Sequence, residues 1–396
     1  MVKTLSSPAG RPRGEHVEDG PRIAIFGAGA IGCYVGGRLA AGGAKVTLIG
    51  RPRVLDELSS GLTVSDLDGD RYTVKVPTTS DHAAARDAEI VLVTVKSAQS
   101  AGAGQALARV GLSSTTKVVS LQNGVRNAEA IEKSLNTKPR PATRSDESGL
   151  HSLKTSSGAP TNGVPKVDSG PVKIETGPVP VPKHVAMGMV PWNVVRRGPG
   201  AYHRGSSGVL MVEHDDGLEP LYRALTHAGI AFETRHDMAA VQWAKLLMNL
   251  NNAVNALSGL PLKDELGQRA YRQVLAAAQR EAVELLEKKG QAIARLTPVP
   301  PSWIPRVLDT PNLVFSIAAR PMIAIDPHAR SSMWDDLEAR RATEIEYLQG
   351  EIVTLAEALG GDAPVNRALA KLVRTAESGG RRMYPADELK KAVGLA

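Results

Sequence analysis

The amino-acid sequence predicts an α/β N-terminal domain, with a doubly wound and mostly parallel sheet, followed by an all-α C-terminal domain. Three observations predict this class. Apolar segments of strand length alternate with helical patterns from Pro21 onward, and such strands are typical of parallel sheets covered by helices on both faces. A glycine-rich turn joins the first strand to the first helix. After about Met238 the pattern is helical, and 396 residues suit two domains.

The elements of the first domain follow in chain order. "RIAIFGA" is predicted to be a strand and residues 30–42 a helix. Further strands are predicted at "AKVTLIG", "EIVLVTVK" and "KVVSLQNG". Folded structure resumes at "VAMGMVPWNVV", and the turn-rich "RRGPGAYHRGSSG" follows it. "LEPLYRALTHAG" is predicted to be a helix and "IAFETR" a last short strand.

The second domain is predicted from helical segments alone. "AAVQWAKLLMNLNNAVNALSG" is expected to form one helix, and "GQRAYRQVLAAAQREAVELLEKKG" another. "SSMWDDLEARRATEIEYLQGEIVTLAEALGG" covers at least two more, and the proline-rich "TPVPPSWIP" breaks the middle. The predicted division is a disordered tail (1–20), the first domain (21–237), the helical domain (238–380) and a C-terminal tail (381–396).

Residues 137–184 are predicted to form a disordered insertion in the first domain. The segment contains eight prolines, many Ser, Thr and Gly residues, and no Phe, Trp or Tyr. Such a composition cannot bury enough apolar surface to offset the entropy of ordering the chain. The insertion contains none of the motifs discussed below.

Composition and charge indicate which classes of ligand the protein binds. The net charge is +7, but no dense run of Lys and Arg occurs and aromatic residues are only 4%. These features favour an anionic cofactor and an acidic small-molecule substrate over a nucleic acid. The single cysteine, Cys33, excludes an internal disulfide and a multi-cysteine metal site. No metal is predicted, and Cys33 is interpreted as a small packed residue.

No membrane segment is expected, because no stretch of about eighteen apolar residues exists. The first twenty residues lack the apolar core of a secretory signal and include Glu15, Glu18 and Asp19, which transit peptides avoid. A cytoplasmic location is therefore expected.

The turn after the first strand predicts a dinucleotide site. Gly27, Gly29 and Gly32 form G-x-G-x-x-G between a strand and a helix. The first glycine permits the tight turn, the second lets the backbone approach a pyrophosphate, and the third lets helix and strand pack closely. The predicted cofactor-binding residues of this loop are Gly27, Ala28, Gly29, Ala30, Ile31 and Gly32. This context indicates a Rossmann domain.

The end of the second strand indicates which dinucleotide binds. An NAD site usually places an acidic residue there, to accept a hydrogen bond from the ribose 2′-hydroxyl. This chain has Gly50 and Arg51 instead, with Arg53 as a second candidate contact. A guanidinium can bind a 2′-phosphate in a bidentate fork, so Arg51 favours NADPH/NADP+. The alternative, a solvated surface arginine, leaves the missing acid unexplained.

The motifs together resemble the ketopantoate reductase family (2-dehydropantoate 2-reductase). The resemblance extends from Ile23 to about Glu377 outside the insertion, and it rests on "GAGAIG", "VTVKS", "LQNG", "WAKLLMN" and "SSMWDDLEARRATEIEYLQG" in that order. It implies a Rossmann domain and a helical domain with the active site between them. The implied reaction is NADPH-dependent reduction of 2-dehydropantoate to pantoate, a step of pantothenate (vitamin B5) and coenzyme A biosynthesis.

The resemblance also implies roles for individual residues. Lys245 of "WAKLLMN" matches the catalytic lysine, and Glu344 of "TEI" matches the active-site glutamate. Asn249 and Ser332 match substrate-binding residues. Lys96 and Asn123 match cofactor-side positions near the nicotinamide, and Asn123 is also expected to reach the substrate.

The helix that contains Lys245 supports the same chemistry without the family. Reduction of a ketone leaves an alkoxide that needs a proton, and a lysine ammonium can polarise the carbonyl and donate that proton. Asn249 lies four residues on, hence on the same face, and Asn252 lies close to that stripe. Three polar residues on an apolar helix predict a polar cleft wall. The alternative is a lysine that extends along apolar surface to reach solvent.

Two further residues have structural alternatives. Ser332, with Asp335 three residues on, fits a helix N-cap box. Glu344, among charged neighbours, fits a solvated helix face, although the "RATEI" match favours a contact with the substrate, such as its hydroxyl.

One departure from the family pattern bears on the substrate. Family members often have a second asparagine four residues after the one that matches Asn249, and this chain has Ala253 there, with Asn252 beside it. The first alternative is therefore a related NADPH-dependent reductase of another branched 2-oxo acid. A non-catalytic NADP(H)-binding sensor is less favoured, because the chain retains four residues of the site: Lys245, Asn249, Ser332 and Glu344. The sequence also admits a homodimer.

Overall fold

A computed structural model describes residues 20–137, 182, 184–318 and 329–395. The predicted N-terminal tail, except Gly20, and nearly all of the predicted insertion lie outside the described residues. The disorder expected for both segments therefore stays a prediction.

The N-terminal domain is built on a sheet of eight strands in the order β12-β11-β8-β7-β6-β1-β2-β5. All neighbours pair in parallel except β11, which runs antiparallel to β8. The predicted doubly wound, mostly parallel α/β sheet is thus confirmed. Its strands are β1 (Arg22–Phe26), β2 (Lys45–Ile49), β5 (Thr78–Thr79), β6 (Ile90–Val93), β7 (Lys117–Ser120), β8 (Val185–Met189), β11 (Leu210–Glu213) and β12 (Phe232–Arg235).

Helices cover both faces of this sheet, which is why its central strands are apolar throughout. In β1, Ile23 and Ile25 belong to one core, with residues of α1 and α5. Ala24 and Phe26 belong to the other core, with residues of α3 and α4. These helices are α1 (Ala30–Ala41), α3 (Ser100–Val110), α4 (Asn127–Leu135) and α5 (Glu219–His227).

A second sheet, which the sequence analysis did not predict, packs beside α1. It has four strands in the order β4-β3-β10-β9. Asp66, directly after β3, is buried, pairs with Arg38 of α1 and accepts a hydrogen bond from the hydroxyl of Tyr34. The segment predicted as turn-rich supplies the hairpin β9–β10, which forms a wall of the cleft described below. The strands are β3 (Leu62–Ser65), β4 (Arg71–Val74), β9 (Val194–Gly198) and β10 (Ala201–Arg204).

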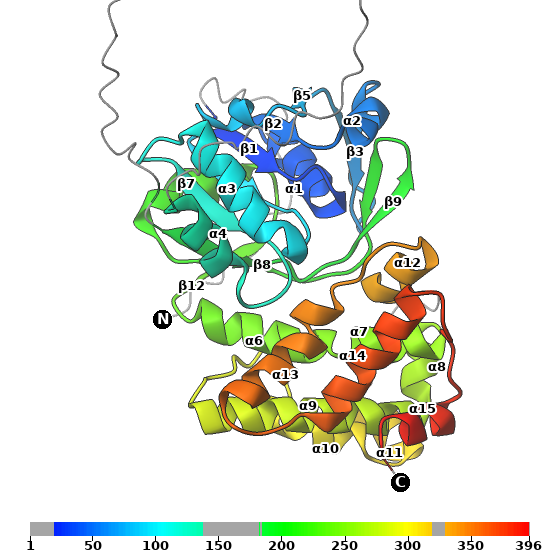
Figure 1. Cartoon of the computed structure of the whole chain (residues 1–396). Coiled ribbons are helices and arrows are strands. Elements are labelled where there is room, and N and C mark those ends of the chain that lie inside the picture. The colour runs from blue at the N-terminus through cyan, green and yellow to red at the C-terminus, as the bar shows by residue number, and fades with distance from the viewer. Residues whose placement is uncertain (1–19, 138–181, 183, 319–328, 396) are drawn as a thin grey trace, which may run out of the picture.

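The C-terminal domain is helical, as predicted, and surrounds the long helix α9 (Figure 1). Residues from α6, α7, α9, α10 and the helices from α11 to α15 share one apolar core. The helices are α6 (Met238–Asn249), α7 (Asn251–Ser258), α8 (Leu262–Gly267), α9 (Arg269–Lys289), α10 (Ile304–Leu308), α11 (Asn312–Ala318), α12 (Ser332–Glu338), α13 (Gln349–Ala358), α14 (Pro364–Glu377) and α15 (Ala386–Ala392).

The single helix predicted after Met238 is wrong, because the chain forms α6 and α7 with a break at Leu250. Near this break, two main-chain carbonyls accept hydrogen bonds from buried side-chain amides. Gln279 Nε2 donates to the carbonyl of Leu247 at 3.0 Å, and Gln349 Nε2 donates to the carbonyl of Leu250 at 2.7 Å. Side chains that insert into the helical hydrogen-bond ladder are a known cause of kinks.

The predicted C-terminal tail (381–396) is also wrong. Residues 386–392 form α15, whose Leu389 is fully buried, and Val393 directly after the helix is 4% exposed. The hydroxyl of Tyr271 in α9 donates to the carbonyl of Tyr384 at 2.7 Å, which fixes the approach to α15. Leu389 and Val393 are four residues apart and pack into the helical core.

The two domains meet at the carboxyl ends of β6 and β7, where α12 and the segment before α13 approach the sheet. Ligands of doubly wound proteins bind at such an edge. Among the described residues, every helix is too short or too polar to span a membrane.

Candidate active site

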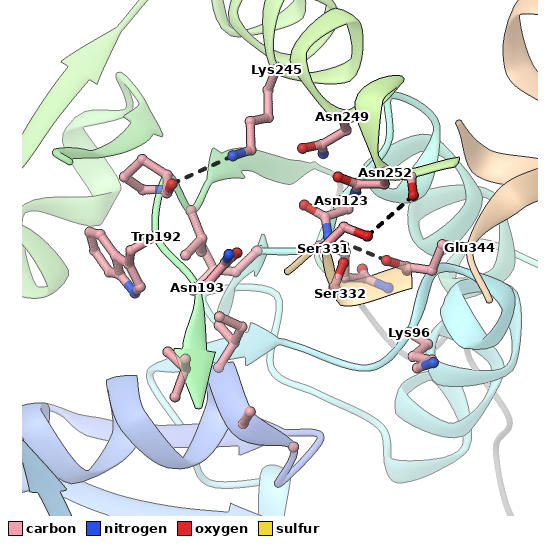
Figure 2. Close-up of a pocket in the computed structure, with 18 of the residues that line it drawn as sticks. Lys96, Asn123, Trp192, Asn193, Lys245, Asn249, Asn252, Ser331, Ser332 and Glu344 are labelled. Atoms are coloured by element: carbon pink, nitrogen blue, oxygen red, sulfur yellow. Dashed lines mark hydrogen bonds between the residues drawn. The ribbon is translucent and has the colours of Figure 1, made fainter. Parts of the chain in front are cut away.

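A cleft of about 1820 Å³ separates the domains, and it brings together the residues that the sequence analysis predicted (Figure 2). Its walls come from the carboxyl ends of β1, β2, β6 and β7, from the hairpin β9–β10, and from α6, α7 and α12. Every predicted site residue lines the cleft except Gly32, which is buried behind the loop.

The glycine loop has the shape that the motif predicts. Gly27 has a φ of 121°, a region that favours glycine, and a Cβ there would lie 2.7 Å from the amide nitrogen of Val95. A Cβ on Gly32 would lie 2.2 Å from the carbonyl oxygen of Gly27. A Cβ on Gly29 would meet nothing within 4 Å. The loop thus leaves room at Gly29, the N-cap of α1, for a phosphate to reach the first-turn N–H groups.

Arg51 lies where the loop and the second strand meet. It is exposed, lines the cleft, and is the N-cap of the short helix α2 (Pro52–Leu58). The carbonyl of Ile49, two residues earlier, accepts hydrogen bonds from the amides of Gly27 and Ala28 at 2.9 and 3.0 Å. Arg51 is therefore held beside the glycine loop, with its guanidinium available to an anion.

Lys245 points into the cleft from the middle of α6 (Figure 2). Its Nζ has one weak contact among the described residues, with the carbonyl oxygen of Pro191 at 3.5 Å. Burial lowers the pKa of Lys245 from 10.5 to about 8, and no carboxylate contributes to the shift. An ammonium with so few partners is suited to polarise a carbonyl and to give up its proton.

Asn249 and Asn252 extend the polar wall from Lys245 along α6 and the start of α7. Both are half-buried and line the cleft. The break at Leu250 therefore does not remove Asn252 from the wall that the helical spacing predicted.

Ser332 also lines the cleft, but it is not the N-cap of α12. Ser331 takes that role, since its Oγ accepts a hydrogen bond from the amide of Trp334 at 3.2 Å. Ser332 is instead the first residue of the helix and is exposed to the cleft. The predicted cap box is therefore wrong. The cap lies one residue earlier, where Trp334 takes the place of the acidic residue of a box, and the hydroxyl of Ser332 is free of the capping bond.

Glu344 is held by residues of the other domain. Its Oε1 accepts hydrogen bonds from the amide nitrogen and the Oγ of Ser97, at 3.1 and 2.7 Å. Its Oε2 accepts one from Asn123 Nδ2 at 3.2 Å (Figure 2). The alternative of a solvated helix face therefore does not hold for Glu344, which lines the cleft as expected. Ser97, which follows Lys96 in the "VTVKS" motif, was not among the predicted site residues.

Lys96 also contacts the helical domain. Its Nζ lies 2.7 Å from Asp336 Oδ2 and 2.9 Å from the carbonyl oxygen of Ala342. Asp336 in turn pairs with Arg341 at 3.1 Å. Asp336 was missed, because nothing local to α12 distinguishes it from the neighbouring Asp335.

Comparison with known proteins adds a family. Residues 23–146 match the model described as "Ketopantoate reductase PanE/ApbA", and residues 237–377 match that of its C-terminal domain. The chain belongs to this ketopantoate reductase family. The sequence resemblance is thereby confirmed, and the two matched ranges contain all the predicted site residues.

The similarity extends over most of the chain. A 2-dehydropantoate 2-reductase from Archaeoglobus fulgidus is 28% identical over 360 residues, which are 90% of this chain and 98% of that protein. A PanE/ApbA family ketopantoate reductase from Ralstonia eutropha has a crystal structure with a TM-score of 0.68, 27% identity, and coverage of 90% and 99%. The structure of D-mandelate dehydrogenase with NADH and anilino(oxo)acetate shares the fold, with a TM-score of 0.66, 18% identity and the same coverage.

The departure from the ketopantoate reductase pattern lies outside the cleft. Ala253 is fully buried in the helical core and does not line the cleft, whereas Asn252 does.

The cleft also contains Trp192 and Asn193, between β8 and β9, which were not among the predicted site residues. Within the described residues, no group of three His, Cys, Asp or Glu side chains is placed to hold a metal ion.

Proposed function

We propose that this chain is a 2-dehydropantoate 2-reductase that uses NADPH and produces pantoate for pantothenate and coenzyme A synthesis. Membership of the ketopantoate reductase family supports the reaction class. The single observation that supports it most is Lys245, a poorly partnered lysine in the cleft opposite the glycine loop, whose pKa burial lowers to about 8.

The first domain binds the cofactor in this proposal. The loop from Gly27 to Gly32 holds the pyrophosphate, and Arg51 pairs with the 2′-phosphate. Lys96 and Asn123, at the ends of β6 and β7, lie at the nicotinamide end. The relatives' cofactor does not decide between the phosphorylated and unphosphorylated forms, since the D-mandelate dehydrogenase structure contains NADH; the preference rests on Arg51 alone.

The helical domain binds the 2-oxo acid. Asn249, Asn252 and Ser332 provide hydrogen bonds to the carboxylate and the oxo group, and Glu344 accepts one from the substrate hydroxyl. Glu344 is therefore expected to exchange part of its contact with Ser97 or Asn123 for the substrate.

Lys245 is the general acid. Bound NADPH supplies the hydride that reduces the carbonyl carbon at C2. The carbonyl oxygen, polarised by the Lys245 ammonium, gains the proton of Nζ as its charge develops, so the product is a 2-hydroxy acid and a neutral lysine. With a pKa of about 8, Lys245 is protonated in most molecules at pH 7, and it can regain its proton from solvent after each turnover.

A steady-state assay tests the proposal. Purified protein is given NADPH or NADH with 2-dehydropantoate and with other branched 2-oxo acids, and the loss of absorbance of the reduced nicotinamide is followed. We expect the largest kcat/KM with 2-dehydropantoate and NADPH. A larger value for another 2-oxo acid would support the related-reductase alternative, for which Ala253 is the motivating residue. No turnover with any of them would support the sensor.

The assembly is proposed separately. A homodimer is expected, and sedimentation equilibrium of the purified chain, with a mass of 41.8 kDa for one copy, tests it.

A further inference from the structure

A short strap, residues 329–331, runs beside α7 and leads into the helix that begins with Ser332. Each of its residues is hydrogen-bonded to α7, to the turn after it or to the first residue of α8. The carbonyl of Ala329 accepts a hydrogen bond from the amide of Leu262 at 2.9 Å. Arg330 Nη1 donates to the carbonyl of Gly259 at 2.6 Å. Ser331 Oγ donates to the carbonyl of Asn252 at 3.2 Å.

The one side chain of α7 that binds the strap is Asn255. It is 0% exposed and does not line the cleft. Its Oδ1 accepts a hydrogen bond from the amide of Ser331 at 2.9 Å. Its Nδ2 donates to the carbonyl of Leu260 at 3.0 Å and lies 3.4 Å from Glu265 Oε2. Asn255 therefore connects the strap, the turn after α7 and a buried carboxyl group.

The asparagines of α7 differ in what they face. Asn251 and Asn252 line the cleft, whereas Asn255 does not. Asn251 and Asn255, four residues apart, both donate to the fully buried Glu265. Asn255 makes no contact that the proposed reaction uses. Buried polar groups of this kind are costly unless they are bonded, and their usual effect is to fix one arrangement of the chain.

We propose that Asn255 is a positioning residue for the substrate: it fixes the main chain at Ser331 and thereby the place of the Ser332 hydroxyl in the cleft. This inference rests on the proposed function, in which Ser332 binds the 2-oxo acid. Ser331 is 3% exposed, so its amide cannot replace the Asn255 bond with a bond to bulk water. Loss of the acceptor leaves that amide unpaired unless the strap moves, and small displacements of a binding group have large effects on turnover.

The test compares two buried asparagines. Asn255→Ala removes the acceptor of the Ser331 amide. Asn366→Ala is the matched control, because Asn366 is also 0% exposed and its Nδ2 donates to a carbonyl (Ala278, 2.9 Å) and to a carboxylate (Glu281, 2.8 Å), in the same domain but away from the cleft. The readouts are KM and kcat for 2-dehydropantoate, the Kd of NADPH from fluorescence, and the melting temperature.

We expect Asn255→Ala to raise KM for 2-dehydropantoate by about tenfold or more, as one unpaired buried group can, with an unchanged Kd for NADPH. Asn366→Ala should lower the melting temperature and leave KM unchanged. KM separates the two roles, because an unfolded fraction lowers the apparent kcat but leaves KM unaltered. An unchanged KM in Asn255→Ala, or an equal rise in both variants, would overturn the positioning role.

Two further measurements keep the result decisive. Asn255→Asp retains an acceptor for the Ser331 amide, so it should keep KM closer to the wild-type value than Asn255→Ala does, and a rise as large as that of alanine contradicts the inference. If Asn255→Ala does not fold, Asn255→Ser, whose hydroxyl is too short to reach that amide, is measured in its place with the same outcomes. Wild-type protein that does not turn over 2-dehydropantoate contradicts the proposed function, and the inference with it. Wild-type turnover with an unaffected KM in the variants contradicts the inference alone.

Discussion

Replacement of Lys245 by methionine should make the protein more stable and much less active. Burial lowers the pKa of Lys245 from 10.5 to about 8, so the folded protein holds this proton less tightly than the unfolded chain does. The destabilisation of the fold by Lys245 therefore grows as the pH falls from 10.5 to 8, and it is complete below pH 8. The difference between the two pKa values corresponds to about 3 kcal/mol of unfolding free energy, at about 1.36 kcal/mol for each pH unit. Water in the cleft screens the charge, so this value is an upper limit.

The assay measures stability and catalysis on the same variant. Urea unfolding is followed by tryptophan fluorescence, to which Trp243, Trp303 and Trp334 of the helical domain contribute. At pH 7, Lys245→Met should gain up to about 3 kcal/mol in unfolding free energy, and the gain should vanish toward pH 10.5, the ordinary pKa of lysine. Its kcat should fall about 10²- to 10⁴-fold, the range for loss of a general acid.

The control is Lys288→Met, which changes an exposed lysine that donates to the carbonyl of Leu359 at 2.9 Å, outside the cleft. It should change neither kcat nor the pH dependence of stability. A kcat of Lys245→Met within a few-fold of wild type would contradict the general-acid role of Lys245. A variant no more stable than wild type at pH 7 would contradict the cost of burying its charge.

Three other expectations follow from the same structure. Arg51→Ala should raise KM for NADPH about ten- to a hundredfold, the value of one charge-assisted contact, and leave KM for NADH nearly unchanged; equal losses with both cofactors contradict the 2′-phosphate role. Burial raises the pKa of Glu265 from 4.5 to about 8, so the unfolding free energy of wild type should fall by up to about 5 kcal/mol as the pH rises from 4.5 to 8. Urea titrations at pH 5 and 9 should show a smaller fall for Glu265→Gln. Burial raises the pKa of the Cys33 thiol to about 11, so native protein should resist an aromatic disulfide reagent at pH 8 that reacts promptly in urea; fast reaction of native protein would show that Cys33 is accessible.

The parts of the site that sequence could predict are those determined by local geometry. The glycine loop is one, because its requirements at Gly27 and Gly32 concern residues that are close along the chain or on adjacent strands. The polar wall from Lys245 to Asn249 is another, since helical spacing alone places the two side chains on one face. Both predictions needed only a period and a residue type.

What sequence could not predict depends on contacts between distant segments. Ser332, with Asp335 three residues on, fits the capping pattern better than Ser331 does, yet Ser331 is the cap, and its amide is bonded to Asn255, 76 residues away. The break at Leu250 depends on Gln349, 99 residues later. The hairpin β9–β10 was missed because Gly198 and Gly200, both with positive φ, give its short strands the composition of a loop.

The contacts between the domains also bear on how strongly ligands bind. Lys96 and Glu344, two groups expected to touch ligands, already have partners across the interface: Asp336 for Lys96, and Ser97 and Asn123 for Glu344. A ligand that binds either group exchanges a protein partner for itself, so the net gain is the difference between two charge-assisted bonds rather than a whole one. Arg51 and Lys245 lack such strong partners among the described residues. Arg51 and Lys245 should therefore account for more of the discrimination between cofactors and of the catalysis than Lys96 and Glu344, although all four line one cleft.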